Sequence, residues 1–126
     1  QHATFTDVTL LAVHSMPSTG LRGELRADIV PGTLGRTTTS ADRLEVVEQV
    51  FRGGGLSVVH DDPYQGGYTT GHYGVPDEGV HAIQIEVNRG LYVSERDGAI
   101  KPEAVDRLRL LFAELVQRLA LLSKRR

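Results

Sequence analysis

Residues 79–92 read GVHAIQIEVNRGLY, and this stretch decides the fold that the sequence predicts. Its side chains alternate between an apolar set, Ile83, Ile85 and Val87, and a polar set, Gln84 and Glu86. A period of two residues is typical of a β-strand with one face in the core, so we expect a strand over residues 81–87 with Glu86 on its polar face. Arg89 follows just past the end of this strand, and open α/β sheets build their sites at that end.

The segment before this strand has the composition of a loop. Residues 64–80 show no apolar period and are rich in turn-forming residues, namely Gly66, Gly67, Gly71, Gly74, Pro76 and Gly79. Such residues favour turns and loops. We therefore expect a loop over residues 64–80, and we interpret this loop and the strand after it as a polar site.

A second informative stretch is VTLLAV at residues 8–13, a continuous apolar run. Runs of this kind are found in strands that are covered on both faces. The run ends abruptly in HSMPS at residues 14–18, which places His14 at the tip of the strand. A histidine there is either a metal ligand or a polar strand-end residue bonded to the loop, and spacing alone does not decide between them.

A βαβ unit is expected in the first half of the chain. A helix over residues 41–52 has apolar side chains at helical spacing and is stopped by three glycines at 53–55. Ser40 or Asp42 can cap its first turn. A short apolar strand is expected over residues 56–60, and together with the strand at 8–14 it gives a unit with a right-handed crossover.

The longest predicted helix covers residues 103–122. One stripe of this helix is apolar and is expected to face the core, and its members are Val105, Leu108, Leu111, Phe112, Leu115, Leu119 and Leu122. Glu114 and Arg118 are expected to form an i,i+4 pair. With 126 residues, 40% of them hydrophobic, the chain is expected to form a single domain over residues 1–126.

Composition limits the classes of partner and site. A net charge of −2 gives no basic surface for nucleic acid, so no nucleic-acid partner is expected. No apolar run approaches the roughly 20 residues that cross a membrane, and no membrane partner is expected. The chain has no cysteine, which leaves histidine and carboxylate side chains as the candidates to hold a metal.

Four motifs together resemble a known family. They are HSMPS from His14, DIVPGTLG from Asp28, DPYQGGYTTGHYGVP from Asp62 and GVHAIQIEVNRGLY from Gly79. In order and approximate spacing they resemble the later part of the N-formylglutamate amidohydrolases, also called N-formylglutamate deformylases, over about residues 8–95. Departures from the usual family residues occur at Asp61, Gly90 and Val93-Ser94, and they bear on substrate choice.

The resemblance implies a fold and an activity. The fold would be α/β, with a mixed, mostly parallel sheet flanked by helices, of the zinc carboxypeptidase-like class and lacking its N-terminal strands. The activity would be zinc-dependent hydrolysis of the formamide bond of N-formyl-L-glutamate to formate and L-glutamate, in histidine degradation in the cytoplasm. Another divalent metal could replace zinc. Family members are longer, so the partners expected are a small anionic N-acyl amino acid and either an upstream segment of the same enzyme or a second copy.

The catalytic candidates each have a structural alternative. The resemblance implies that Glu86 is the general base, whereas the alternative is a solvated carboxylate paired with Arg89. Arg89 itself is a candidate clamp for a substrate carboxylate or a member of that same ion pair. His14 is the metal ligand that the resemblance implies.

The remaining candidates are expected to bind substrate. His72 and His81 are either site residues or histidines that pack the loop. Gly66 and Gly67, with Gly71, would let the backbone approach a small anion closely. Two other functions stay open: a non-catalytic fragment or interaction module that retains the fold, and a zinc amidase for another N-acyl amino acid or peptide.

Overall fold

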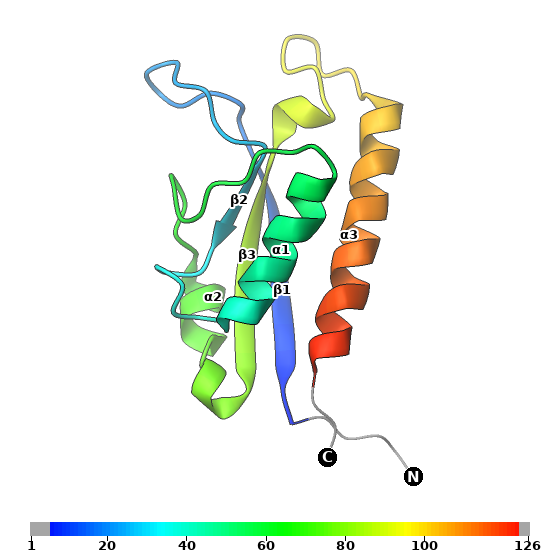
Figure 1. Cartoon of the computed structure of the whole chain (residues 1–126). Helices are drawn as coiled ribbons and strands as arrows, with labels where there is room; N and C mark the ends of the chain where they lie inside the picture. The colour runs from blue at the N-terminus through cyan, green and yellow to red at the C-terminus, as the bar shows by residue number, and fades with distance from the viewer. Residues whose placement is uncertain (1–5, 124–126) are drawn as a thin grey trace.

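The computed structural model describes residues 6–123, which form a mixed α/β domain with one sheet (Figure 1). Its elements are β1 (Val8–Met16), β2 (Ile29–Gly32), α1 (Ala41–Gly53), α2 (Tyr68–Tyr73), β3 (Val80–Asn88) and α3 (Pro102–Leu122), with 3-10 turns at Pro76–Glu78 and Arg89–Leu91. The strand order is β1-β3-β2. β3 is parallel to β1 and antiparallel to β2, so the predicted mixed sheet is confirmed, although only one of its pairings is parallel.

Helices α1 and α3 lie side by side on one face of the sheet and form the core with it (Figure 1). Ile83 and Ile85 of β3 are fully buried in this core, as Leu115 of α3 is. The rings of Phe51 in α1 and Phe112 in α3 meet edge to face, with 5.2 Å between their centroids. Aromatic contacts of this geometry add to the stabilisation that apolar burial gives. The strands predicted at 8–14 and 81–87 and both long helices are therefore confirmed.

The polar face predicted for β3 is not solvated. Glu86 is 6% exposed and Gln84 is 8% exposed, so β3 is buried on both faces although its pattern alternates. The segment around α2 contacts β3 and covers this second face. The prediction of a loop over residues 64–80 is wrong in part, because the segment contains α2 and a 3-10 turn.

The strand predicted at residues 56–60 is wrong. Val58 forms only an isolated bridge with Ile29, and the parallel neighbour of β1 is β3. The predicted βαβ unit with 56–60 as its second strand is therefore wrong as well. The third strand of the sheet is β2, which the sequence does not predict because it contains Pro31 and Gly32. Proline is tolerated there because β2 lies at the edge of the sheet.

Helix α3 begins with Pro102 in its first turn, where the missing N–H costs nothing. Leu115 and Leu119 are buried and the other members of the apolar stripe are half-buried, so the stripe faces the core as predicted. The predicted pair between Glu114 and Arg118 does not form among residues 6–123. Arg118 donates to Gln49 of α1 instead, which ties the two helices together.

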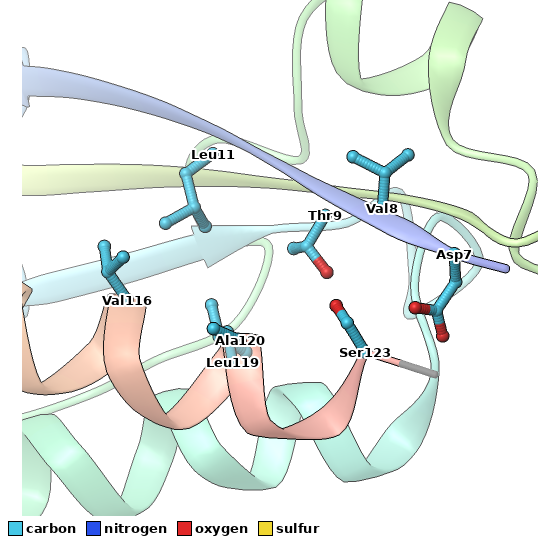
Figure 2. A pocket seen from close by; sticks show the side chains of 8 residues that line it. All are labelled: Asp7, Val8, Thr9, Leu11, Val116, Leu119, Ala120 and Ser123. Carbon is cyan, nitrogen blue, oxygen red and sulfur yellow. The ribbon is translucent and has the colours of Figure 1, made fainter. Parts of the chain in front are cut away.

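Strand β1 forms the free edge of the sheet within the described residues. An apolar groove of about 540 Å³ lies between this strand and the C-terminal half of α3 (Figure 2). Leu11 and Thr9 project from β1 toward Val116 and Ala120 across it. Elsewhere along the edge Val13 is 52% exposed, so β1 presents apolar side chains as well as backbone. Across residues 6–123, no helix combines the length and the apolar character that crossing a membrane requires.

Candidate active site

The register of the sheet places His14 beside Glu86. The two residues are Cα partners in the parallel strands β1 and β3, and neighbouring strands lie roughly 4.8 Å apart. In-register residues of parallel strands point to the same face. Ile83 and Ile85 face the helices, so Glu86 and His14 project from the opposite face.

Burial differs sharply between these two side chains. Glu86 is 6% exposed, whereas His14 is exposed to solvent. Within the described part of the chain the His14 imidazole has no hydrogen-bond partner, so the alternative in which it is bonded to the adjacent loop is not what the structure has. A buried carboxylate beside an accessible imidazole is an arrangement that can act on a molecule from solvent.

Gln84 connects Glu86 to the glycine-containing loop. Its Nε2 donates to Glu86 Oε2 at 2.9 Å, and its Oε1 accepts from the N–H of Gly67 at 2.7 Å. The sequence does not single out Gln84 as a site residue. The signal was present, since Gln84 shares a strand face with Glu86, but a bond to residue 67 depends on how the loop folds back.

The glycines of this loop lie on the same face of the sheet as Glu86. A Cβ on Gly32 of β2 would come within 2.9 Å of the Gly66 nitrogen, which shows how closely loop and strand approach. Gly66 has φ of +128°, a value that favours glycine. Gly67 thus lies against the face of β3 that carries Glu86, where its N–H is engaged by Gln84, and a substrate-binding role for Gly66 and Gly67 stays a prediction.

Arg89 lies in the 3-10 turn after β3 and is half-buried. Among the described residues it forms no ion pair with Glu86, so the structural alternative in which the two are paired does not hold in this structure. Arg89 is instead close enough to Glu95 to affect it electrostatically. Hydrogen bonds from Ser18 to the Glu95 carboxylate lower the pKa of Glu95, and the charges of Arg89 and Lys101 lower it further.

A second guanidinium, that of Arg26, lies near the carboxyl end of β3. Asn88 donates through Nδ2 to the carbonyl oxygen of Arg26 at 3.3 Å. The Arg26 side chain lies over the Tyr64 ring at 5.3 Å from its centroid and donates to the Tyr64 hydroxyl at 3.0 Å. The sequence gives no signal for Arg26, because it lies in a connection without periodic spacing.

The structure does not bring the other two histidines to Glu86. His81 is buried at the start of β3 on the helix-facing side, where Nδ1 accepts from the N–H of Ser40 at 3.1 Å. His72 is exposed on α2, stacked on Tyr68 with 4.9 Å between ring centroids. No contact joins His72 to Glu86 within residues 6–123. Both histidines therefore make packing contacts, and a substrate-binding role for either stays a prediction.

A metal site needs more ligands than this face provides. Catalytic zinc usually has three protein ligands. Residues 6–123 contain no group of three or more His, Cys, Asp or Glu side chains placed to hold a metal ion. His14 is one candidate donor, and the described residues alone do not fit a zinc centre.

The α/β sheet holds a buried carboxylate beside an accessible histidine, under a glycine-containing loop, and groups of these kinds are used for acid–base chemistry in hydrolases. The chain belongs to the N-formylglutamate amidohydrolase family, whose sequence model matches residues 1–93.

Two relatives support this assignment. N-formylglutamate deformylase of Pseudomonas aeruginosa is 34% identical over 80 residues, which are 63% of this chain and 29% of that protein. The crystal structure of N-formylglutamate amidohydrolase from Ralstonia eutropha JMP134 superposes with a TM-score of 0.78 at 28% identity, covering 88% of this chain and 42% of that one. The chain thus spans less than half the length of either relative.

Proposed function

We propose that this chain contributes to a site that hydrolyses the formamide bond of N-formyl-L-glutamate, releasing formate and L-glutamate. The observation that carries the proposal is the pairing of His14 with the buried Glu86 in adjacent parallel strands. The names of the two relatives support the choice of substrate.

Glu86 is the general base in this proposal. Amide hydrolysis needs a proton removed from the attacking water and a proton delivered to the departing nitrogen, and one positioned carboxylate can do both in turn. The burial of Glu86 limits its contact with bulk water, so the transferred proton is retained for the leaving group. Arg89 binds a carboxylate of the substrate, because a guanidinium matches a carboxylate with two parallel hydrogen bonds.

We also propose that the site uses zinc, or another divalent metal, with His14 as one ligand. Bound zinc would supply a water of lowered pKa and would polarise the formyl oxygen. Because the described residues offer one candidate ligand, the others would come from further polypeptide or from a second copy. A fold of the zinc carboxypeptidase-like class is part of the same proposal.

The free edge of β1 is where such additional polypeptide would pair. Its backbone groups have no strand partner on that side within residues 6–123, and the groove beside α3 offers apolar surface. We expect the isolated chain to associate, and sedimentation velocity over a range of concentrations measures this. A stable monomer that releases formate would show that the site needs no partner.

The activity is tested with a chimera in which this chain replaces the matching region of the Ralstonia eutropha enzyme. Formate release from N-formyl-L-glutamate is the readout, and Glu86→Gln is the matched variant because it keeps the shape of the side chain. We expect kcat to fall by about 10² to 10⁴ in that variant, the range for loss of acid–base catalysis. A folded chimera that releases no formate would contradict the proposal.

The chimera also tests two alternative functions, a non-catalytic interaction module and an amidase for another N-acyl substrate. The absence of a ligand set among the described residues favours a non-catalytic interaction module as the second candidate. Metal analysis of the chimera separates the two, because a module without a complete site retains no stoichiometric metal. Parallel assays with N-acetyl-L-glutamate and a short formylated peptide test the amidase that acts on another N-acyl substrate.

A further inference from the structure

Gln84 occupies a constrained position between the glycine-containing loop and Glu86. It is 8% exposed, and both of its polar atoms are used, Oε1 by the Gly67 N–H and Nε2 by Glu86 Oε2. Because a backbone N–H can only donate, the side-chain oxygen of Gln84 must face Gly67. Its NH₂ group must then face Glu86, so the orientation of the amide is fixed by its partners.

From this arrangement we propose that Gln84 is a positioning residue, which holds the Glu86 carboxylate in place and couples it to the loop at Gly67. The inference rests on the proposed function, because it assigns Gln84 a role toward the general base. Gln84 does not take part in proton transfer in this proposal, and it acts through Glu86.

The contact constrains the geometry of Glu86. A donor aimed at Oε2 fixes the orientation of the carboxylate, and a general base must be held within hydrogen-bond reach of the proton that it removes. Among residues 6–123, Gln84 is the one hydrogen-bond donor that reaches the Glu86 side chain.

The neighbours of Glu86 in the sheet leave the hydrogen bond from Gln84 as the contact to test by substitution. In the sheet it is flanked by His14 of β1 and Val30 of β2, so His14 is the ionisable neighbour in the adjacent strands. Gly67, which lies over this face through its bond to Gln84, brings no charged side chain. A His14→Gln background therefore separates the effect of the imidazole from the effect of Gln84.

The decisive variant is Gln84→Glu. It keeps an acceptor for the Gly67 N–H, but it replaces the donor to Glu86 with a second carboxylate. Like charges at this distance repel, so the Glu86 carboxylate should leave the orientation that Gln84 gives it. Gln84→Asn is the second variant, because its shorter side chain cannot span both partners, and it serves if Gln84→Glu fails to fold. Gln65→Glu is the matched control, since it makes the same change on an exposed side chain of the neighbouring loop.

The first measurement does not depend on activity. The Glu86 side-chain carboxyl carbon is observed by ¹³C NMR in the full chain at a single pH, and its resonance is assigned by its absence in Glu86→Gln. We expect its chemical shift to change in Gln84→Glu and in Gln84→Asn, because both lose the donor to Oε2, and to stay unchanged in Gln65→Glu. An unchanged Glu86 resonance in both Gln84 variants would overturn the inference.

The second measurement is kcat and KM for formate release by the chimera described above. In both Gln84 variants kcat should fall about 10-fold or more, with KM little changed. A changed Glu86 resonance in a protein that releases no formate would support the contact and contradict the proposed function. An unchanged kcat, or a rise in KM as large as the fall in kcat, would show that Gln84 does not position the general base.

Discussion

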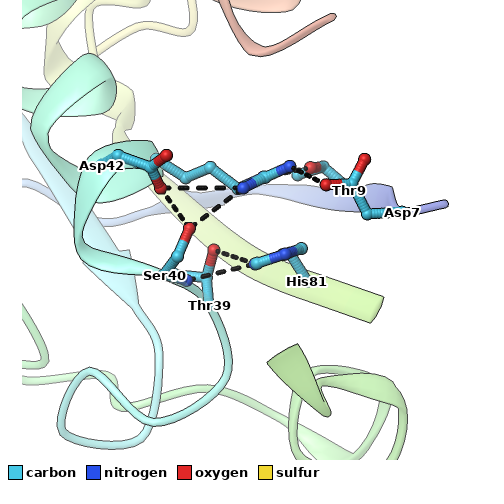
Figure 3. Close-up of polar contacts among 7 residues, drawn as sticks. Asp7, Thr9, Thr39, Ser40, Asp42 and His81 are labelled. Carbon is cyan, nitrogen blue, oxygen red and sulfur yellow. Dashed lines mark hydrogen bonds and ion pairs between the residues drawn. The ribbon is translucent and has the colours of Figure 1, made fainter. Parts of the chain in front are cut away.

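Strand β3 carries two clusters that combine a histidine with carboxylates, and they differ in how their polar atoms are used. One cluster lies at the start of the strand on the helix-facing side, around His81 and Arg43 (Figure 3). The other lies toward the end of the strand on the opposite face, around His14 and Glu86. Residue types alone do not separate the two.

In the cluster at the start of β3, the polar groups bind one another. Arg43 is 3% exposed and donates to Thr9 and Asp7 at 2.9 Å and to Ser40 at 3.0 Å. The N–H of Ser40, the N-cap residue of α1, donates to His81 Nδ1 (Figure 3). This nitrogen must therefore be unprotonated, and the imidazole holds the start of the helix. The cluster fixes the first turn of α1 to two strands, and we interpret it as structural.

The cluster around Glu86 is organised differently. Its carboxylate is held by Gln84, whereas the imidazole beside it is exposed and makes no hydrogen bond within the described residues. A structural cluster is therefore one whose polar atoms all bind one another, whereas a candidate site keeps a polar group accessible to a ligand. Substitutions in the cluster around His81 and Arg43 should change stability, and substitutions around His14 and Glu86 should change binding or rate.

The largest effect is expected from Arg43→Ala. Arg43→Ala removes one partner of a buried ion pair, a change that is strongly destabilising, and we expect the free energy of unfolding to fall by about 3 to 5 kcal/mol. Urea denaturation followed by circular dichroism measures the change. Arg109→Ala is the control, because its pair with Asp106 is exposed, and it should change stability by less than about 1 kcal/mol. Equal effects of the two variants would contradict the interpretation of the Arg43 cluster as structural.

His14→Ala should leave stability nearly unchanged and remove metal binding. Loss of a ligand should cost more than the roughly 10- to 100-fold in affinity that loss of an outer-shell partner costs. Metal content of the chimera after dialysis, measured by mass spectrometry, tests this. His72→Ala is the matched control on an exposed histidine, and loss of metal in that variant would identify His72 as a ligand instead.

Arg89→Lys separates the two guanidinium groups near the end of β3. Lysine keeps the charge but loses the planar fork, so KM for N-formyl-L-glutamate should rise about 10-fold with kcat little changed. The same substitution at Arg26 should have a smaller effect, because that side chain is engaged by Tyr64. If Arg26→Lys raises KM more than Arg89→Lys does, Arg26 is the carboxylate clamp.

The smallest effect concerns the pH dependence of stability. Burial lowers the pKa of His81, and the charge of Arg43 lowers it further, although Asp7 and Asp42 act in the opposite direction. The contribution of His81 is therefore complete above the unfolded pKa of about 6.5 and is lost as the pH falls below it. His81→Asn keeps an acceptor for the Ser40 N–H. Stability of this variant should depend less on pH between about 7 and 5 than that of the original chain, and identical pH dependence would contradict the assignment.

The sequence predicts the elements whose patterns are periodic. Strands β1 and β3 and helices α1 and α3 follow from runs or stripes of apolar residues, and burial of those residues is what forms them. Strand β2 is not predictable in this way, because Pro31 and Gly32 disfavour strands and only an edge position makes them acceptable. The apolar run at 56–60 has strand-like composition, but it meets β2 only through the bonds of Ile29 with Ser57 and Val59, which form an isolated bridge and no strand.

The site is predictable in its residue types but not in its pairings. Glu86 follows from the alternation of β3, and His14 follows from the end of an apolar run. Their adjacency is set by strand order and register, which depend on contacts between distant segments. For the same reason, no local pattern indicates that Gln84 would bond to Gly67 or that His81 would face α1.

The exposed edge of β1 has a consequence for handling the protein at high concentration. A long strand with unpaired N–H and C=O groups and apolar side chains is a template for intermolecular β-pairing. Val13, at 52% exposure, lies on this edge and carries no charge to oppose such pairing. A lysine at position 13 would act as a gatekeeper against amyloid-like stacking, leaving the face that carries His14 and Glu86 unaltered.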